Sequence, residues 1–575
     1  MADGEYSTTF AAGTQVDAPA GSSTLASGMT INNGIVKTGA GALRQYSTSG
    51  RRLCLPLRRK PFHSDVCSRS QILGFKFQTR TRHVADTFLI NSARRKTRPM
   101  PHPNILFILT DDQGPWAMGC AGNTEVRTPN LDRLAAEGMR FESFFCTSPV
   151  CSPARASILT GRIPSQHGVH DFLHWGRYMP GATADETRFL ADMPTSASIL
   201  AETGYATCLS GKWHLGYGLE PQAGFERWHA MPYGGSDYYH PPLAENGEVV
   251  MHDGEYATDL YTDNALRFLD EAAGSEQPFC LHMHYTAPHS PWGREQHPVD
   301  LWDDYFHNCP FDATPDDPPP DFLSCETRDT AYRRSSLAGY YAALEAMDRN
   351  VGRLLDRLER HGLREDTLVV FMSDNGMNMG HHGLYGKGNA SWPQNMFDPS
   401  VKVPCLISRP GHVPAGKVNS DLLSQYDWLP TLLDYLGLQD ALPAGLPGRS
   451  FAPLLHGETL DGDSKPIVVF DEYGPVRMIR TQEWKLVWRY PAGPHELYHL
   501  AKDPDETRNL FDYRGNAEIV QSLRADLDAW FARYAVAGFD GKRLPVTGRG
   551  QLGPADRPNA FTARRPEAWR PSLNA

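Results

Sequence analysis

Beyond residue 104, short apolar runs alternate with longer amphipathic ones. The apolar runs have the length of buried strands and lie at residues 105–110, 205–210, 279–285, 367–372 and 404–408. Helical patterns lie between them, at residues 128–137, 196–203, 337–361 and 427–436. In the longest helical pattern, apolar residues recur on one side: Leu344, Met347, Val351, Leu354 and Leu358. This alternation predicts an α/β fold with a mostly parallel central sheet sandwiched by helices.

The pattern changes after about residue 455. Short strand-like runs follow at residues 466–470, 476–480 and 484–488, and a helix is predicted near residues 517–534. These elements predict a smaller C-terminal antiparallel sheet with a helix packed on it. We divide the chain into a basic extension (1–99), a main α/β domain (100–460), an α+β subdomain (461–540) and an irregular tail (541–575).

Charge is unevenly distributed along the chain. Residues 1–100 hold 15 Lys and Arg against 5 Asp and Glu, whereas the 575-residue chain has a net charge of −11, so the remainder carries −21. The acidic remainder argues against nucleic acid as a partner. We interpret the basic part as a solvated, disordered arm. No apolar run approaches the roughly 18 residues of a membrane span, so we expect no membrane partner either.

The N-terminal extension shows no apolar signal-peptide segment near Met1, which makes the cytoplasm the default location. Met100 stands directly before the first predicted strand. We therefore expect residues 1–99 either to precede the true start or to form a dispensable extension. The ten cysteines are irregularly spaced, which favours a largely reduced protein and leaves any disulfide unassigned.

Two predicted strands end in the same kind of polar cluster. One runs into Asp111 and Asp112, and the other runs into Asp374 and Asn375. The carboxyl ends of parallel strands meet at one edge of a sheet, where three uncompensated carboxylates would repel one another. A divalent cation relieves that repulsion, and oxygen ligands select Ca²⁺ or Mg²⁺. Either pair alone is better explained by a turn or a helix cap, but both together favour a metal site.

Cationic and imidazole side chains follow other strand ends. Lys212 and His214 stand two positions apart, so both point to one side of an extended chain. His289 lies in a Pro-flanked loop, and Lys387 lies in a Gly-rich loop. Lysine and histidine beside a metal suit a tetrahedral oxyanion. In isolation, Lys212 is better explained as a surface lysine, His214 as a packed histidine, and the other two as ordinary loop residues. Only their expected position at one edge of the sheet favours a site.

A lone cysteine, Cys151, begins a predicted helix in the stretch 150-VCSPARASILTGR-162. It has no CxxC partner and no histidine at zinc-finger spacing, so a thiol is unexplained there. This stretch and 211-GKWHLG-216 resemble the two signatures of type I, formylglycine-dependent sulfatases of the arylsulfatase kind. The first signature, Cys-x-Pro-x-Arg followed by Thr-Gly-Arg, is met by Cys151, Pro153, Arg155, Thr160, Gly161 and Arg162.

The resemblance spans about residues 103–510. It implies an alkaline-phosphatase-like fold and a sulfuric ester hydrolase that releases inorganic sulfate. It also implies that a formylglycine-generating maturation enzyme oxidises Cys151 to Cα-formylglycine. The hydrated aldehyde has one hydroxyl to attack sulfur, which gives a covalent sulfoenzyme, and a second hydroxyl to expel the product. A thiol offers neither route.

The resemblance assigns the other residues as well. One Ca²⁺ would be bound by an oxygen of residue 151 and by four side chains, Asp111, Asp112, Asp374 and Asn375. The developing charge on the sulfuryl group would be stabilised by Arg155, Lys212 and Lys387. His289, helped by Lys387, would protonate the leaving alcohol, and His214 would take the proton from the second hydroxyl.

The segment 164-PSQHGVHDFLHWGR-177 suggests substrate contacts. His167, His170 and Asp171 would hydrogen-bond a sugar ring on which Trp175 stacks, although a structured loop with buried histidines explains the segment equally well. We expect a small or exo-terminal carbohydrate sulfate, because the acidic body would repel a long polyanion.

Three alternatives remain open at this point. A phosphonate monoester or phosphodiester hydrolase belongs to the same superfamily and shares the metal and the formylglycine. A non-catalytic binding protein on this fold would lack a ligand or the nucleophile. A metal-binding structural protein would leave the cysteine signature without a purpose.

Overall fold

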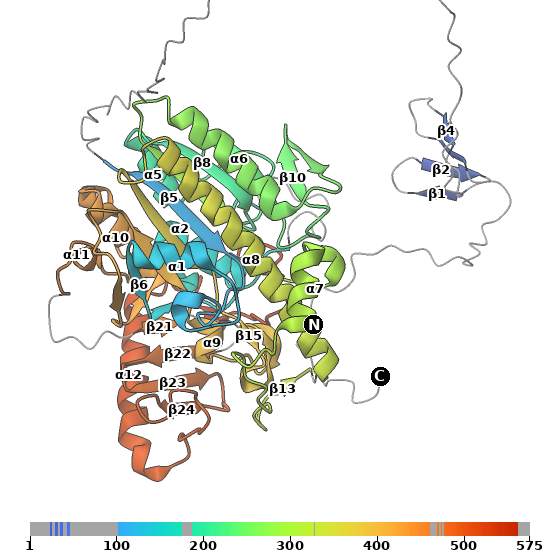
Figure 1. The fold of residues 1–575 in the computed structure, drawn as a ribbon. Helices are drawn as coiled ribbons and strands as arrows, with labels where there is room; N and C mark the ends of the chain where they lie inside the picture. Colours follow the sequence, from blue (N-terminus) through green and yellow to red (C-terminus); the bar gives the residue numbers. More distant parts are fainter. Residues whose placement is uncertain are drawn as a thin grey trace, which may run out of the picture. The chain divides into compact units, whose positions relative to one another are not determined.

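We describe the protein from a computed structural model (Figure 1). The structure describes residues 102–174, 187–326, 328–460, 468–470, 473 and 476–561, and four strands within residues 23–45. The chain divides into two compact units, one of residues 5–97 and a main unit that contains residues 98–575.

The first unit contains a small antiparallel sheet that the sequence pattern did not predict. Its strands pair in the order β1 (Ser23–Leu25), β2 (Met29–Asn32), β3 (Ile35–Lys37) and β4 (Leu43–Gln45). The rest of the predicted disordered arm, Met100 included, lies outside the described residues.

An eight-stranded sheet forms the centre of the main unit, in the order β19-β6-β18-β14-β5-β12-β8-β9. From the first edge to the last, its strands are β19 (Lys417–Asn419), β6 (Met139–Phe141), β18 (Cys405–Ser408), β14 (Thr367–Ser373), β5 (Asn104–Thr110), β12 (Phe279–His284), β8 (Ala206–Lys212) and β9 (Arg227–Met231). The strands from β14 to β9 are mutually parallel, whereas β18 is antiparallel to β14 and to β6. The predicted mostly parallel sheet is confirmed.

The central strand β5 faces two hydrophobic cores. Leu106 and Ile108 belong to one core, and Ile105, Phe107 and Leu109 belong to the other. A strand that is buried on both faces needs an apolar residue at every position, which explains the continuous apolar run.

Helices cover both faces of the sheet (Figure 1). The first core contains side chains of α1 (Pro129–Ala136), α6 (Ala257–Ala272), α7 (Val299–Asn308) and α8 (Thr330–Arg360). The second core contains side chains of α2 (Cys151–Thr160), α5 (Ser196–Glu202), α10 (Trp428–Tyr435) and α11 (Ala452–Leu455). The sequence pattern did not predict α6 and α7.

The smaller C-terminal sheet is also confirmed. It is antiparallel and contains β21 (Val468–Phe470), β22 (Val476–Arg480), β23 (Trp484–Arg489) and β24 (Glu496–His499). The helix α12 (Ala517–Tyr534) packs Leu523, Leu527 and Phe531 against one face of the sheet. Val476 and Met478 on the other face join the second core of the main sheet, so the subdomain is continuous with the main domain.

The predicted irregular tail is packed against the main unit as far as residue 561. Apart from one short 3-10 helix, Gly541–Arg543, it contains isolated bridges that join Gln551 to Leu173 and to Phe561. Val546 and Ala560 are buried in a small cluster there. Residues 562–575 lie outside the described residues.

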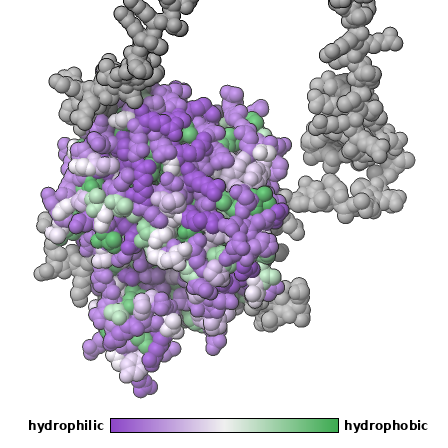
Figure 2. Space-filling view, in the orientation of Figure 1, coloured by the Kyte–Doolittle hydropathy of each residue, from purple (hydrophilic) through white to green (hydrophobic). Residues whose placement is uncertain are grey.

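The face shown in Figure 2 is covered mainly by hydrophilic residues, with hydrophobic residues in small separate patches. Among the described residues, every helix is too short or too polar to span a membrane.

Candidate active site

The side chains singled out in the sequence gather at the carboxyl edge of the central sheet. Strand β5 leads into Asp111 and Asp112, and its parallel neighbour β14 leads into Asp374 and Asn375. The register places Thr110 opposite Ser373, so the two strands end level with each other.

The strands on the other side of β5 add further residues at the same edge. Strand β12 leads into the loop of His289, and Lys212 ends β8, two residues before His214. A side chain at Gly211 is impossible, because a Cβ there would lie 1.9 Å from the carbonyl oxygen of His284. The close approach of β8 and β12 thus depends on this glycine.

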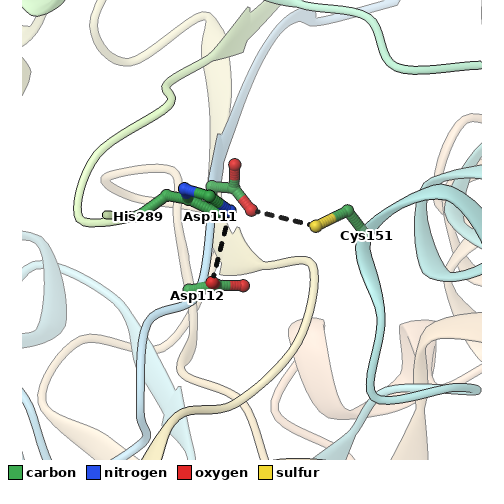
Figure 3. Close-up of side chains that lie close together, drawn as sticks. All are labelled: Asp111, Asp112, Cys151 and His289. Carbon is green, nitrogen blue, oxygen red and sulfur yellow. Dashed lines mark hydrogen bonds and ion pairs between the residues drawn. The ribbon is translucent and has the colours of Figure 1, made fainter. Parts of the chain in front are cut away.

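Four side chains form a cluster that could hold a metal ion (Figure 3). One ligand atom from each of Asp111, Asp112, Cys151 and His289 lies within 4.8 Å of the others. The Sγ of Cys151 lies 3.4 Å from Oδ1 of Asp111, and Nε2 of His289 lies 3.6 Å from Oδ2 of Asp112. His289 joins this cluster, although the sequence suggested only a proton-transfer role for it.

Asp374 and Asn375 border the same cluster. Oδ1 of Asp374 accepts the main-chain N–H of Asp112 at 3.2 Å, and the side-chain amide of Asn375 lies 2.8 Å from Oδ1 of Asp112. The Oδ1 of Asn375 is buried and has no hydrogen-bond partner among the described residues. An unsatisfied amide oxygen beside three carboxylates is a donor set that fits a hard cation such as Ca²⁺.

Three cations that were expected at this site pair with the carboxylates. Arg155 Nη2 lies 2.9 Å from Oδ2 of Asp374. Lys212 pairs with Asp111, and Lys387 Nζ lies 2.5 Å from Oδ1 of Asp112. The cations come from α2, from the end of β8 and from the loop after β16 (Tyr385–Gly386), which the two strand ends alone could not reveal. The case for a metal therefore rests on the oxygen donors and not on charge repulsion.

The same cations influence the pKa values of the carboxyl groups. Burial raises the pKa of Asp111, but the charges of Lys212, His289 and other cations outweigh burial and hold the pKa below its usual range. Burial and the nearby charge of Asp111 raise the pKa of Asp374. Asp111 is thus ionised, and it lies beside the sulfur atom of residue 151.

Cys151 is the first residue of α2, where the positive end of the helix favours an anion. It is only 3% exposed, and Lys387 Nζ lies 3.0 Å from its Sγ. Burial and the charge of Asp111 raise the pKa of its thiol to about 12. The thiol is therefore protonated at neutral pH and is not an activated nucleophile.

His214 is held in one orientation beside α2. Its backbone lies in the left-handed region at φ 52°, and its Nε2 lies 3.3 Å from the carbonyl oxygen of Leu173. A carbonyl only accepts hydrogen bonds, so Nε2 carries the hydrogen. Nδ1 is buried without a hydrogen-bond partner in the part of the chain that the structure describes. Burial and the charges of Lys212 and Arg155 lower the pKa of His214 well below its usual value, so the ring is neutral and Nδ1 carries no hydrogen.

Two glycines that the sequence pattern did not single out lie against His214 and His289. A Cβ at Gly234 would lie 2.7 Å from ring atoms of His214, and one at Gly235 would lie 3.5 Å from His289. The pair 234-GG-235 is visible in the sequence, but only the fold brings it to the site.

A pocket opens beside Asp112, His289 and Lys387. Its aromatic lining consists of Trp292, Tyr332 and Tyr385, and its charged lining includes Glu326 and Arg328. The guanidinium of Arg328 lies 4.2 Å from the ring centre of Tyr332. Aromatic faces with a few polar groups are typical of a small-molecule site. The sequence contains one indication of this pocket, because Trp292 stands three residues after His289.

The structure places the predicted sugar-binding residues elsewhere. His167 Nε2 lies 3.1 Å from Oγ of Ser157, His170 Nε2 lies 2.9 Å from the carbonyl oxygen of Phe539, and both histidines are buried. Asp171 is fully buried as well. None of the three lines the pocket beside the cluster, so the geometry favours the alternative of a structured loop with buried histidines. Trp175 lies outside the described residues.

Comparisons with known proteins agree with this geometry. The family model "Sulfatase" matches residues 103–438, and the model "N-sulphoglucosamine sulphohydrolase, C-terminal" matches residues 380–532. An N-acetylglucosamine-6-O-sulfatase of Bacteroides thetaiotaomicron is 30% identical, and the match covers 77% of this chain and 88% of the relative.

Two solved structures are similar to the chain. One is a protein in complex with its substrate D-glucosamine-2-N,6-O-disulfate, at a TM-score of 0.64 and 26% identity, with 77% of this chain and 100% of that chain covered. The other is the phosphonate monoester hydrolase of Agrobacterium radiobacter, at a TM-score of 0.55 and 22% identity, with 75% and 96% covered. The second likeness shows a shared fold alone.

Proposed function

Because the chain belongs to the sulfatase family and is a sulfatase, we propose that it releases sulfate from a small or exo-terminal carbohydrate sulfate ester, with Ca²⁺ and a formylglycine at position 151. One observation carries the proposal: Cys151 belongs to the cluster of Asp111, Asp112 and His289, and Lys387, which lines the aromatic pocket, has its Nζ 3.0 Å from the sulfur atom of Cys151.

The residues around position 151 fit both groups. A bound Ca²⁺, held by Asp111, Asp112, Asp374 and Asn375, would polarise the sulfate oxygens and acidify a hydroxyl near it. A hydrated formylglycine would supply the two hydroxyls that a thiol lacks, which gives the protonated, buried Cys151 a chemical purpose.

The remaining charged residues would bind and polarise the ester. Arg155 and Lys212 are fully buried, and Lys387 is nearly so. Positive charge that is preorganised in a buried site stabilises charge that develops on a sulfuryl group far better than charge in water does. Their pairing with the three carboxylates holds the cations in place before a substrate arrives.

Two histidines would move protons in the site. His289 stands at the pocket, where it would protonate the oxygen of the leaving alcohol. His214, neutral and with Nδ1 unpartnered among the described side chains, would accept a proton beside residue 151.

The pocket supports a sugar as the leaving group. Trp292, Tyr332 and Tyr385 offer faces on which a sugar ring can pack, and Glu326 and Arg328 offer hydrogen bonds to hydroxyls. The relative from Bacteroides thetaiotaomicron is described as an N-acetylglucosamine-6-O-sulfatase. The net charge of −21 beyond residue 100 disfavours a long polyanion.

Mass spectrometry and a sulfate-release assay test the proposal on one preparation. The peptide that spans residue 151 should carry the aldehyde in protein made with a maturation enzyme and the thiol without it. Only the aldehyde form should release sulfate from N-acetylglucosamine 6-sulfate, at a higher kcat/KM than from a long sulfated polysaccharide. Equal release by the thiol form would contradict the role of formylglycine, and a preference for the polymer would contradict the substrate.

A phosphonate monoester hydrolase is the second candidate, because the solved structure of that enzyme shares the fold. The kcat/KM values on an aryl sulfate and on an aryl phosphonate monoester separate the two. We expect the sulfate ester to be the better substrate.

A further inference from the structure

The residues after α12 return to the main core and pack against the segment that follows α2. We call residues 546–561 the C-terminal strap and residues 168–174 the inner segment. The two family matches end at residues 438 and 532, before the strap begins. The strap is therefore an ordered part of this chain for which the family resemblance does not account.

Gln551 is the main point of contact between the two segments. Its side chain is 0% exposed. Oε1 accepts the main-chain N–H of His170 at 2.8 Å, and Nε2 donates to the carbonyl oxygens of Gly168 at 2.8 Å and Gly553 at 2.9 Å. The acceptor and both donors of the amide are thus used, and an alanine would leave three main-chain groups, two of them buried, without these partners.

The main chain of Gln551 adds a short bridge to the inner segment. Gln551 pairs with Leu173 in parallel. Its N–H donates to the carbonyl oxygen of Phe172 at 2.8 Å, and its own carbonyl accepts the N–H of His174 at 3.0 Å. The main-chain groups on either side of Leu173 are therefore both hydrogen-bonded to Gln551.

Gly550 permits this close approach. Its N–H donates to Oδ2 of Asp171 at 2.9 Å, and its φ is +107°. A Cβ at this position would lie 2.0 Å from Nε2 of His174. Only glycine combines the backbone angle with the space, so docking of the strap depends on it.

The inner segment reaches the active site through Leu173. The N–H of Leu173 donates to Oγ of Ser152 at 3.1 Å, and its carbonyl accepts from Nε2 of His214 at 3.3 Å. Oγ of Ser152 donates in turn to the carbonyl oxygen of His214 at 2.9 Å. Leu173 thus contacts both His214 and Ser152, the residue that directly follows Cys151.

We propose that Gln551 is a positioning residue of the active site, through which the C-terminal strap holds His214 in its working orientation. The inference rests on the proposed function, in which His214 accepts a proton. With the inner segment clamped, the carbonyl of Leu173 keeps the hydrogen on Nε2 of His214 and leaves Nδ1 as the acceptor. A displacement of about 1 Å at such a contact costs on the order of 100-fold in rate.

Two variants of the full-length, matured enzyme test the proposal. Gln551→Ala removes the side-chain hydrogen bonds, and Gly550→Ala forces the strap away from His174. We expect each to lower kcat about 10-fold to 100-fold, with KM changed less than about twofold because the pocket is untouched. Hydrogen exchange of residues 168–174 should rise in both variants.

The control is Leu527→Ala, which destabilises the buried contact of α12 without touching the inner segment. It should lower the Tm while kcat and the exchange of residues 168–174 stay at the wild-type level. If Leu527→Ala and Gln551→Ala have the same Tm and lose the same amount of kcat, the strap contributes only to stability and the proposal is wrong.

The double variant Gln551→Ala/Gly550→Ala provides a second criterion. Both changes undock the same segment, so their effects on kcat should be far from additive. Wild-type kcat in both single variants would overturn the inference while the sulfatase assignment stands. A matured wild-type enzyme that hydrolyses no sulfate ester would instead overturn the proposed function.

Discussion

Lys387 Nζ lies 3.0 Å from Sγ of Cys151, although 236 positions separate the two residues in the sequence. The same nitrogen lies 2.5 Å from Oδ1 of Asp112. One lysine thus joins the reacting position to the oxygen-donor cluster. Burial alone would lower its pKa, but the charges of Asp112 and Asp111 raise it well above the usual value, so the lysine stays protonated.

Removal of this cation should affect the transition state more than substrate binding. We expect Lys387→Ala to lower kcat for sulfate release by about 100-fold to 1000-fold, the usual cost of one oxyanion-stabilising donor. Steady-state kinetics on an aryl sulfate measure the loss. Lys502→Ala, an exposed lysine, is the control and should leave kcat unchanged. A kcat within twofold of wild type for Lys387→Ala would remove this residue from the site.

Metal removal should reduce both activity and stability. The oxygen donors around Asp112 fit Ca²⁺, and a ligand that binds only the folded state adds about 2.7 kcal/mol of stability at 100 times its Kd. We expect a calcium chelator to abolish sulfate release and lower the Tm, and added Ca²⁺ to restore both. Asp112→Asn should lose the Tm response to Ca²⁺, whereas the exposed Asp526→Asn should keep it. Full activity after exhaustive chelation would contradict the metal site.

The packing of Gly234 against His214 predicts a purely steric effect. Gly234→Ala would place a Cβ 2.7 Å from the imidazole ring, so the ring must move. We expect kcat to fall about 10-fold to 100-fold with a smaller change in KM. Gly274→Ala is the control, since its Cβ would meet only one atom, at 3.6 Å. Equal kcat values for the two variants would show that the ring tolerates the added methyl group.

Asp171 should make stability depend on pH. Burial raises the pKa of Asp171 to about 7, even though hydrogen bonds from Gly550 and Phe172 lower it. At a pH between the unfolded pKa, near 4, and the folded pKa, the Asp171 carboxyl is ionised in the unfolded chain and protonated in the folded chain. The contribution of Asp171 to the free energy of unfolding therefore falls as the pH rises through this range.

Between the two pKa values of Asp171, the free energy of unfolding should fall by about 1.4 kcal/mol per pH unit. Urea unfolding midpoints at pH 5, 6, 7 and 8 measure it, and Asp171→Asn is the comparison. The wild type should lose stability relative to the variant between pH 5 and 7 and run parallel to it above pH 8. Parallel profiles across the whole range would contradict the raised pKa.

The pocket residue Trp292 should contribute to sugar binding and little to sulfuryl transfer. We expect Trp292→Ala to raise KM for a sulfated monosaccharide about 10-fold and to leave kcat within about threefold. Trp530 lies on α12, packs in the core of the smaller sheet and does not line the pocket, so it is the control. Trp530→Ala should leave KM unchanged. An unchanged KM in Trp292→Ala would place the sugar elsewhere.

Local pattern was sufficient to predict much of the fold. The uninterrupted apolar run of β5 required a strand buried on both faces, and the one-sided stripe that includes Leu344 and Leu358 required a helix against that sheet. Helices α6 and α7 were missed because their apolar positions are interspersed with polar and charged ones.

The candidate site was also predictable in part. Asp111, Asp112, Asp374 and Asn375 were predictable as one group, because parallel strands must end at a common edge. The cations Arg155, Lys212 and Lys387 were expected there too, but which carboxylate each one pairs with was not predictable, since they come from three separate elements.

The sequence by itself determined which chemistry the chain carries: the cysteine signature, the acid pairs and the strand order in which they appear. Only the tertiary structure decided which side chains face each other. It drew His167, His170 and Asp171 into buried contacts, assembled the pocket from Trp292, Tyr332 and Tyr385, and laid Gln551 against Leu173, 378 residues away in the chain. The physical reason is that signatures and periodicity report only neighbours in sequence, whereas hydrogen bonds and packing join segments that meet when the whole chain folds.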